Sequence, residues 1–591
     1  MFTTRPEILG TFGVVASTHW LASATGMAIL EKGGNAFDAA AAMGFALQVV
    51  EPHLNGPGGD MPLLMYSARE RRLRVVCGQG PAPEAATIAA YRDLGLDIVP
   101  GTGLLATCVP GAFDAWLLML RDHGTMSLRE VLTPAIDFAG KGYPLVSHIC
   151  NTIDSVRELF LTEWKTSAEI YLPNGEVPAP GTIFRNRRLA ETYSRILAEG
   201  EAAGGGREAV IDAARRAWGE GFVAEAVDRF CRENEVMDTS GSRHRGLLTG
   251  NDMAKWRASY EDALTYDYGR YTVAKPGPWA QSPVFLQQLA LLEGFDIAAM
   301  DPLGPEFVHT VVEAAKLAYA DREAYYGDPA HVDVPMETLL GRAYNDERRK
   351  LIDDRASFEL RPGRIEGYSG RIGKAEIDEA LRSAAGAGEP TMAKTGTMPG
   401  DTCHIDVIDR DGNMVSATPS GGWLQSSPII PELGFCLGSR AQMFWLEEGL
   451  PGSLAPGKRP RTTLSPSFAF RDGEPYMPFG TPGGDGQDQW TLIFFLRHVH
   501  HGMNLQEAID APTFQTAHFP SSFYPRQALP GRVTVEGRLP QATVAELKRR
   551  GHEVEIGGDW SQGRISACAR DGEVLKAAAN PRLMQGYAIG R

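Results

Sequence analysis

Thr402 carries a hydroxyl at a junction between two very different stretches of sequence. The residues before it, 360–400, are rich in glycine and proline and lack apolar periodicity, which predicts an exposed strap. The residues after it alternate between apolar and polar, which predicts a core strand. A threonine hydroxyl attacks a carbonyl carbon only when a base takes its proton. On the local sequence alone, the plainer interpretation is a strand residue chosen for its β-propensity.

A predicted β-hairpin positions this residue. The first strand begins at Cys403, Asp411-Gly412 supplies a tight turn, and the second strand covers residues 414–418. Ser420 follows at the end of the second strand. Amphipathic or apolar segments predict helices near residues 21–30, 36–50, 305–326 and 488–503, and alternating segments predict strands near 65–77, 264–273 and 477–480. Strands beside helices on both sides of the hairpin indicate a layered α/β fold.

Short motifs typical of one protein family run through almost the whole chain. They include Gly13-Val-Val-Ala-Ser17, residues 33–41, Glu51-Pro-His53, Gly56-Pro-Gly-Gly59, Ala318-Tyr-Ala-Asp-Arg322, Gly327-Asp-Pro329, Lys458-Arg-Pro460, residues 462–466, Gly480-Thr-Pro-Gly-Gly484 and Asn580-Pro-Arg582. On these motifs, in this order, and on the junction at Thr402, the chain resembles the gamma-glutamyltransferase family of N-terminal-nucleophile hydrolases.

The resemblance implies a four-layer αββα sandwich, an α/β (α+β) fold built from two interleaved segments. It also implies that the precursor cuts itself between Asp401 and Thr402. The large segment would be residues 1–401, with the strap at about 360–401, and the small segment residues 402–591. The two would stay together as a heterodimer, and a dimer of these is left open.

A cut before Thr402 would give that residue its own base. Its new α-amine, with a pKa of about 7.7, is substantially neutral near physiological pH, whereas a lysine side chain at about 10.4 is hardly so. One residue would then supply both the nucleophile and the proton acceptor.

The same resemblance implies roles for other small and hydroxyl-bearing residues. Ser420 stands where the family has a threonine that hydrogen-bonds the nucleophile. Gly483 and Gly484 match the pair whose N–H groups hold the oxyanion, since no Cβ blocks their approach. Thr462 and Thr463 occupy the place of paired hydroxyls that contact the carboxylate end of the substrate.

Three positions depart from the family's pattern for binding a γ-glutamyl group. Gly78 stands where the family has a carboxylate-binding arginine, Met443 where an aspartate binds the α-ammonium group, and Gly422 where there is an asparagine. Without these partners a zwitterionic head group would be desolvated and unpaired, which is costly. Two cations remain near these segments, Arg440 and Arg461. Arg461 is either a bidentate carboxylate binder or an exposed, solvated side chain.

We therefore predict a self-cleaving amide hydrolase or acyltransferase that passes the acyl group of a small-molecule amide to water or an amine. The amide is expected to differ from a standard γ-glutamyl compound, with an acyl part that is apolar or carries one carboxylate. Bulky apolar residues could line its pocket or belong to the ordinary core (Trp423, Leu424, Met443, Phe444 and Trp445). Two alternatives stay open: a true γ-glutamyl transferase or glutathione hydrolase with a clamp rebuilt from Arg440 and Arg461, and an uncleaved, non-catalytic scaffold.

Composition excludes several other classes. A net charge of -15 without a stripe of lysine and arginine argues against nucleic-acid binding. The glycine-rich residues 480–486 are not followed by the lysine that a phosphate-binding loop requires. The sequence also has no cluster of Cys and His residues with the spacing of metal ligands. We therefore expect neither a cofactor nor a metal. Seven scattered cysteines favour reduced core thiols and hence the cytoplasm. Residues 8–24 imitate a secretory signal faintly, which would place the protein in the periplasm, but their apolar run is too short to span a membrane.

Overall fold

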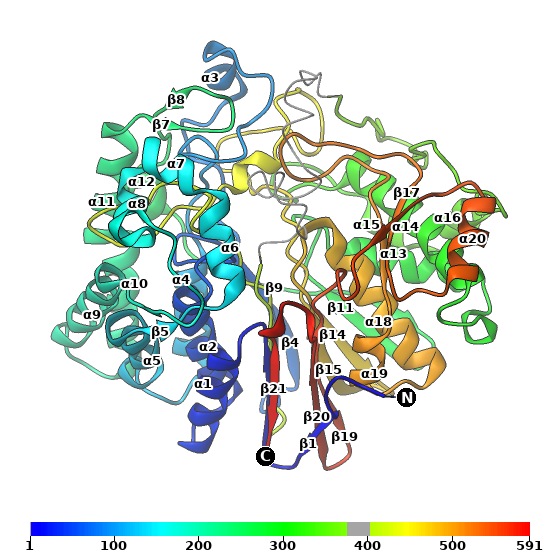
Figure 1. Ribbon diagram of the computed structural model, residues 1–591, viewed down its shortest axis with the longest axis horizontal. Coiled ribbons are helices and arrows are strands. Elements are labelled where there is room, and N and C mark those ends of the chain that lie inside the picture. Colours follow the sequence, from blue (N-terminus) through cyan, green and yellow to red (C-terminus); the bar gives the residue numbers. More distant parts are fainter. Residues whose placement is uncertain (1, 375–401) are drawn as a thin grey trace.

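Two seven-stranded sheets form the centre of the molecule in the computed structural model, which describes residues 2–374 and 402–591 (Figure 1). In spatial order, the first sheet contains β1 (Ile8–Gly10), β20 (Val574–Ala579), β19 (Ser566–Asp571), β15 (Glu474–Gly480), β14 (Ser467–Arg471), β11 (Tyr271–Lys275) and β10 (Leu264–Tyr268). The second contains β21 (Tyr587–Gly590), β2 (Gly13–Ser17), β12 (Ile405–Asp409), β13 (Met414–Ala417), β3 (Met61–Ser67), β4 (Arg72–Gly78) and β9 (Ser259–Glu261). Neighbouring strands within both sheets are antiparallel.

The two sheets pack face to face through apolar and small side chains. Val14 of β2 and Leu64 of β3 come from one sheet, and Phe468 of β14 and Ala577 of β20 come from the other. Successive residues of a strand point to opposite faces. Val15, next to Val14, therefore belongs to the core between its sheet and the helices.

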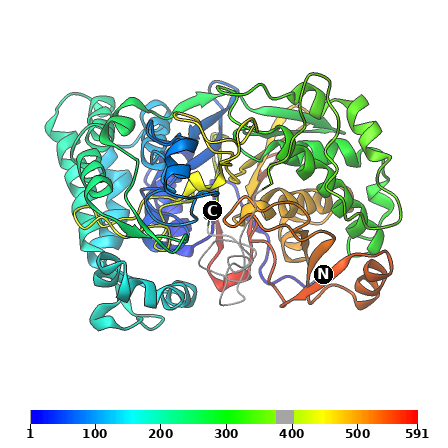
Figure 2. The same ribbon diagram turned by 90° about the horizontal axis from the view of Figure 1, so that it is seen from above.

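Helices cover the outer face of each sheet (Figures 1 and 2). Beside the second sheet lie α1 (Trp20–Glu31), α2 (Ala36–Val50) and α4 (Ala112–His123). Outside them, α5 (Leu128–Lys141) packs on α2, α9 (Arg187–Ala202) on α5, α10 (Arg207–Gly219) on α4 and α9, and α11 (Phe222–Glu233) on α10. Beside the first sheet lie α13 (Pro283–Leu292) and α18 (Gln487–His501), and α14 (Pro305–Tyr325) packs on α13. The predicted αββα sandwich is confirmed.

Smaller elements complete the chain. A third sheet of β16 (Phe514–Thr516), β17 (Arg532–Glu536) and β18 (Glu553–Gly557) packs with α20 (Gln541–Arg549) beside α14. Two-stranded sheets join β5 (Tyr143–Pro144) to β6 (Ile183–Phe184) and β7 (Val236–Met237) to β8 (Arg243–His244). The short helices are α3 (Ile88–Asp93), α6 (Ser147–Ser155), α7 (Arg157–Thr162), α8 (Lys165–Tyr171), α12 (Gly250–Lys255), α15 (Met336–Leu340), α16 (Arg342–Arg349) and α19 (Leu505–Asp510).

The helix behind the predicted hairpin has clear local signals. Asn35 caps α2: its side chain accepts from the N–H groups of Phe37 and Asp38, and the Asp38 carboxylate accepts from the N–H of Asn35. Every residue of α2 is buried, and its alanines allow close approach to α1 and to β12.

The predicted hairpin is present and lies inside the second sheet. Ile405 pairs with Ala417 and Val407 with Val415. On its outer sides β12 pairs with β2, and β13 pairs with β3. Strands from after Thr402 are thus inserted between strands from the first part of the chain.

The predicted strap is described only in part. Residues 360–374 contain no helix or strand and are mostly exposed or half-buried. The rest of the strap, including Asp401, lies outside the described residues.

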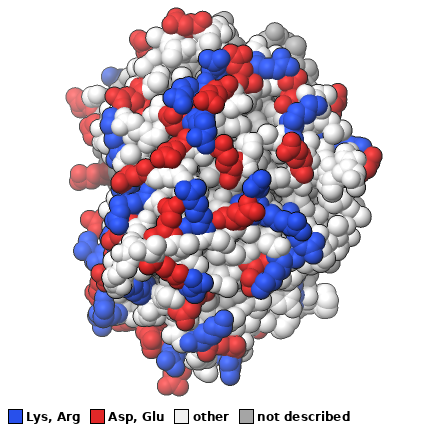
Figure 3. Space-filling view, turned by 90° about the vertical axis from the view of Figure 1, so that its left-hand side faces the viewer, with Lys and Arg blue, Asp and Glu red and all other residues white. Residues whose placement is uncertain are grey.

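The surface and the cysteines agree with the composition. On the face shown in Figure 3, basic and acidic side chains are interspersed. All seven cysteines are free and buried, as predicted. None of the helices in the described ranges has the length and apolarity needed to cross a bilayer.

Candidate active site

Thr402 and Ser420 face each other at one end of the hairpin. The two residues form an antiparallel bridge, and the hydroxyl oxygens Thr402 Oγ1 and Ser420 Oγ are 3.1 Å apart. The Cys403 N–H donates to the Pro419 carbonyl at 2.9 Å, which extends the ladder to this end. Both hydroxyl residues are almost fully buried. The hairpin therefore fixes the orientation of one hydroxyl against the other.

A buried polar chain lies directly below this pair, between the two sheets. His404 Nδ1 is 2.9 Å from Thr418 Oγ1, and its Nε2 is 3.0 Å from an oxygen of Asp406. The other Asp406 oxygen accepts from the Ser566 hydroxyl at 2.8 Å. Burial raises the pKa of Asp406 above its ordinary value, although His404 opposes this. Sequence reasoning missed the chain because its partners come from separate strands.

Gly483 and Gly484 follow the end of β15. Gly480, the last residue of β15, packs on the ring of His404, which is two positions after Thr402 in the chain. A Cβ on Gly480 would lie 2.2 Å from a carbon of that ring. Gly483 and Gly484 have φ values of 129° and 51°, a region that L side chains rarely adopt. Among the described residues, neither N–H group donates a hydrogen bond. The two groups are thus available to an oxyanion.

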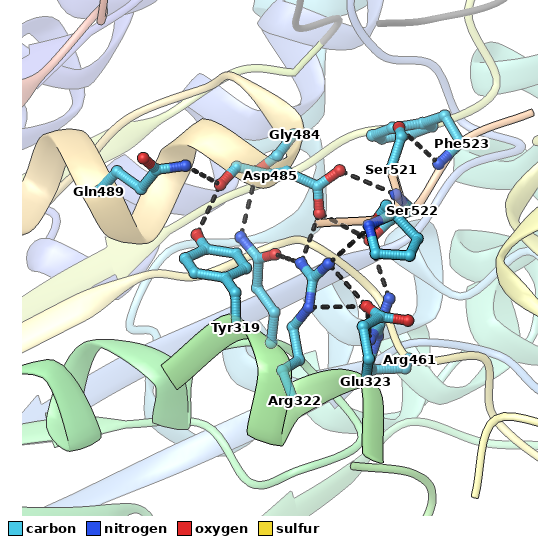
Figure 4. Close-up of polar contacts among 12 residues, drawn as sticks. Tyr319, Arg322, Glu323, Arg461, Gly484, Asp485, Gln489, Ser521, Ser522 and Phe523 are labelled. Carbon is cyan, nitrogen blue, oxygen red and sulfur yellow. Dashed lines mark hydrogen bonds and ion pairs between the residues drawn. The ribbon is translucent and has the colours of Figure 1, made fainter. Parts of the chain in front are cut away.

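A network from α14 holds the backbone beyond these glycines (Figure 4). The Asp485 carboxylate pairs with Arg322 and accepts from the Ser522 N–H at 2.8 Å and hydroxyl at 2.7 Å. The Tyr319 hydroxyl donates to the Asp485 carbonyl, and the Gln281 amide donates to the Gly484 carbonyl at 3.1 Å. This network was not predicted, although Tyr319 and Arg322 belong to a motif that the sequence displays. It fixes the loop that carries the glycine pair.

The two candidate cations are both engaged within the protein. Arg461 is buried, its Nη1 lies 2.6 Å from Glu323 Oε1, and its Nη2 donates to the Ser522 hydroxyl at 3.0 Å. It is therefore not an exposed, solvated side chain. Arg440 is also buried, with Nε 2.9 Å and Nη2 3.0 Å from the two oxygens of Asp60.

The paired threonines lie beside this second ion pair. The Thr462 hydroxyl is 3.5 Å from Asp60 Oδ2, and its backbone N–H donates to the Trp279 carbonyl at 3.0 Å. The Thr463 hydroxyl is buried and has no hydrogen-bond partner among the described residues. Such a group is the kind that a bound ligand satisfies.

Comparison with known proteins identifies the family to which this chain belongs. A family model described as gamma-glutamyltranspeptidase matches residues 22–590. The chain belongs to the gamma-glutamyltranspeptidase family. It is 31% identical to the glutathione hydrolase-like YwrD proenzyme of Bacillus subtilis (strain 168), with 99% of each chain covered.

Two solved structures resemble this family member over its whole length. LmbA2991HD is 56% identical with a TM-score of 0.92, and 100% of both chains is covered. The cephalosporin acylase of Bacillus halodurans is 27% identical with a TM-score of 0.83, covering 100% of this chain and 98% of the other. The protein is thus an enzyme of the N-terminal-nucleophile type, an amide hydrolase or acyltransferase of the gamma-glutamyltranspeptidase family.

Two of the three positions that we predicted to depart from the family's pattern are tightly packed. A Cβ on Gly78, at the end of β4, would lie 2.4 Å from the Met61 carbonyl oxygen and 2.7 Å from the Ala115 Cβ. A Cβ on Gly422 would lie 2.8 Å from the backbone nitrogen of Gly59. Neither position has room for a longer side chain unless the backbone moves. Met443, the third predicted position, is buried in the short 3-10 helix Arg440–Met443.

One group of residues in the described ranges has the spacing of metal ligands. Ligand atoms of His309, Glu313 and His552 lie within 4.8 Å of one another and all three residues are buried. The Lys316 ammonium donates to Glu313 at 2.6 Å, and His309 Nδ1 is 2.8 Å from His552 Nε2. A cation would face that ammonium group, and we assign no metal to this cluster.

Proposed function

We propose that this family member cuts its own chain before Thr402 and then uses Thr402 to hydrolyse or transfer the acyl group of a small amide. The observation that carries the proposal is the placement of the Thr402 hydroxyl. It lies 3.1 Å from the Ser420 hydroxyl, just before a core strand. Gly483 and Gly484 follow β15, whose last residue packs on His404, and their N–H groups donate no hydrogen bond within residues 2–374 and 402–591.

In the first step of the proposal, the Thr402 oxygen attacks the Asp401 carbonyl carbon. The peptide C–N bond breaks, the Thr402 nitrogen takes the proton, and an ester links the two segments until water cleaves it. The freed α-amine then accepts the hydroxyl proton when Thr402 attacks a substrate amide. Gly483 and Gly484 donate to the oxyanion, the proton passes to the leaving amine, and water or another amine releases the acyl group.

The proposed substrate is not a standard γ-glutamyl compound. Backbone atoms fill the space at Gly78 and Gly422, where the family's pattern has longer side chains. The rival interpretation, a clamp rebuilt from Arg440 and Arg461, would require both to leave buried carboxylates, and an unpaired buried charge is costly. Trp423 and Phe444 are buried, and Phe444 belongs to an apolar cluster. The likeness to a cephalosporin acylase supports an acyl group of another kind.

A denaturing gel and intact-mass measurement of purified protein test the self-cleavage. We expect two chains that meet between Asp401 and Thr402, one uncut chain for Thr402→Ala, and slow processing for Ser420→Ala. Ser420→Thr keeps the hydroxyl and should process normally. An active preparation that contains only the full-length chain would refute the mechanism, and an inactive, uncut wild type would support the scaffold alternative.

The substrate is tested with 4-nitroanilides. We expect simple acyl anilides to be hydrolysed with a higher kcat/KM than the γ-glutamyl anilide. Equal or better use of the γ-glutamyl compound would favour the rebuilt clamp.

A further inference from the structure

We propose that Glu51 is a positioning residue for Thr402, which it holds in place through the side chain of Cys403. The inference rests on the proposed function of Thr402 and deepens it, because it names a residue outside the reacting groups that sets the geometry of the nucleophile. Glu51 opens the motif Glu51-Pro-His53, to which the proposed mechanism assigns no step.

Thr402 lies at an end of the hairpin that the regular strand ladder does not reach. Thr402, Cys403 and His404 come before β12, which begins at Ile405. After the proposed cut they would be the first three residues of the small segment, and chain ends fray unless contacts tie them down. The position of Thr402 therefore depends on the side-chain contacts of these residues.

The Cys403 side chain supplies such a contact on the helix side of the sheet. Cys403 is fully buried in the core cluster around α2, and its thiol donates to Glu51 Oε2 at 2.8 Å. Its sulfur accepts from the Asn55 amide at 3.1 Å. Successive residues of an extended chain point to opposite faces. Fixing the Cys403 side chain therefore also fixes the direction in which the Thr402 side chain points.

The Glu51 carboxyl group is held by residues other than Cys403 as well. Its Oε2 accepts from the Thr18 hydroxyl at 2.6 Å, and its Oε1 accepts from the Gln585 amide. Thr18 follows β2, Gln585 lies shortly before β21, and Glu51 itself follows the last residue of α2. Three separate parts of the chain thus converge on one buried carboxyl group, which makes it a fixed acceptor for the thiol.

The turn after α2 places Asn55 on the sulfur as well. The Asn55 N–H donates to the Glu51 carbonyl at 3.2 Å, and its side-chain amide also donates to the Leu47 carbonyl at 2.9 Å. The Asn55 backbone forms a bridge with Gly421, the neighbour of Ser420. One turn thus contacts the chain neighbours of both residues of the hydroxyl pair.

Burial keeps the thiol in the protonated form that this contact needs. It raises the pKa of Cys403 well above its ordinary value, and the charge and the hydrogen bond of Glu51 act in the same direction. Burial also raises the pKa of Glu51, although the hydrogen bond from Cys403 opposes this. A thiol with a raised pKa is a poor nucleophile. Cys403 therefore serves as a hydrogen-bond donor and not as a reactive thiol.

The test follows the cut itself, because this reaction requires no knowledge of the substrate. Full-length chain made by cell-free synthesis is sampled over time on a denaturing gel. Cys403→Ala should be cut at least about tenfold more slowly than the wild type, because a small displacement of a reacting group costs much of the rate. Cys403→Ser keeps a donor and should stay within about threefold of the wild type. Cys231→Ala, the same change at another buried cysteine of the same cluster, is the matched control and should be cut at the wild-type rate.

A double variant shows whether Glu51 acts through Cys403. Glu51→Leu removes the acceptor without leaving a buried charge and should slow the cut at least as much as Cys403→Ala. Adding Cys403→Ala to Glu51→Leu should then change the rate by less than about twofold, because both remove the same contact. Hydrogen exchange of residues 402–408 in the cut protein is a second readout. It should be faster in both single variants than in the wild type, and unchanged in Cys231→Ala.

The outcomes separate this inference from the function on which it rests. A wild type that is cut, with Cys403→Ala cut at the same rate, overturns the positioning role and leaves the function of Thr402 intact. Equal slowing in Cys403→Ala and Cys231→Ala, or losses that multiply in the double variant, would overturn it too. If Cys403→Ala or Glu51→Leu does not fold, the other variant compared with Cys403→Ser decides. A wild type that is not cut refutes the proposed function itself.

Discussion

At the scale of single residues, Gly483 and Gly484 show how the absence of a side chain allows a backbone position that the proposed oxyanion site needs. Gly483 has φ 129°, and a Cβ on it would lie 2.1 Å from the Trp490 ring. An alanine must therefore shift the backbone whose N–H is proposed to hold the oxyanion. Trp490 is a buried residue of α18, so its ring has little space into which to move.

We expect Gly483→Ala to lower kcat by about 100-fold or more, the size of effect known for losing one oxyanion donor. Gly473→Ala is the matched control, because Gly473 also has positive φ, 81°, but nothing lies within 4 Å of its Cβ position. Steady-state kinetics and a thermal unfolding curve of each variant separate catalysis from stability. Wild-type kcat in Gly483→Ala would remove this glycine from the mechanism.

At the scale of elements, one buried ion pair ties the glycine-rich loop after α2 to the segment after the hairpin. Asp60 exchanges backbone hydrogen bonds with Ser420, at 2.9 and 3.0 Å, while its carboxylate holds Arg440. The loop that carries Ser420 is thus fixed by backbone and by charge together.

Removing one partner should therefore be costly. We expect Arg440→Met to reduce the free energy of unfolding by about 3–5 kcal/mol, because it leaves the Asp60 carboxylate buried and unpaired. Arg72→Met breaks the exposed pair with Asp262, at 3.0 Å, and should change stability little. Urea unfolding followed by fluorescence measures both. A loss in Arg440→Met no larger than in Arg72→Met would show that Asp60 is satisfied without its arginine.

At the scale of the whole molecule, the two predicted segments share both sheets. Strands β12 and β13 lie between β2 and β3, and β20 pairs with β1 near the start of the chain. After a cut before Thr402, separation would break ladders in the centre of one sheet and expose apolar faces in both.

We therefore expect the cut protein to migrate as one particle in size-exclusion chromatography and its segments to unfold together in urea. The uncut Thr402→Ala protein is the control and should elute at the same volume. Elution of residues 402–591 on their own in native buffer would contradict the interleaved architecture.

The sequence alone determined the features that depend on local order and on family motifs. The hairpin followed from alternation around Asp411-Gly412, and α2 from the apolar segment at residues 36–50. The αββα sandwich and the family followed from motifs that run in order along the chain. Roles for Thr402, Ser420 and the glycine pair were predicted from those motifs and remain predictions, although the structure brings the two hydroxyls together.

Only the tertiary structure decided which charged side chains form ion pairs with other residues of the protein. Nothing in the sequence near Arg461 or Arg440 indicates Glu323 or Asp60, which are more than a hundred positions away. The same holds for the Arg322–Asp485 network, whose two residues are 163 positions apart. Periodicity reports which face of an element is buried, whereas the partner of a buried charge depends on how distant elements pack.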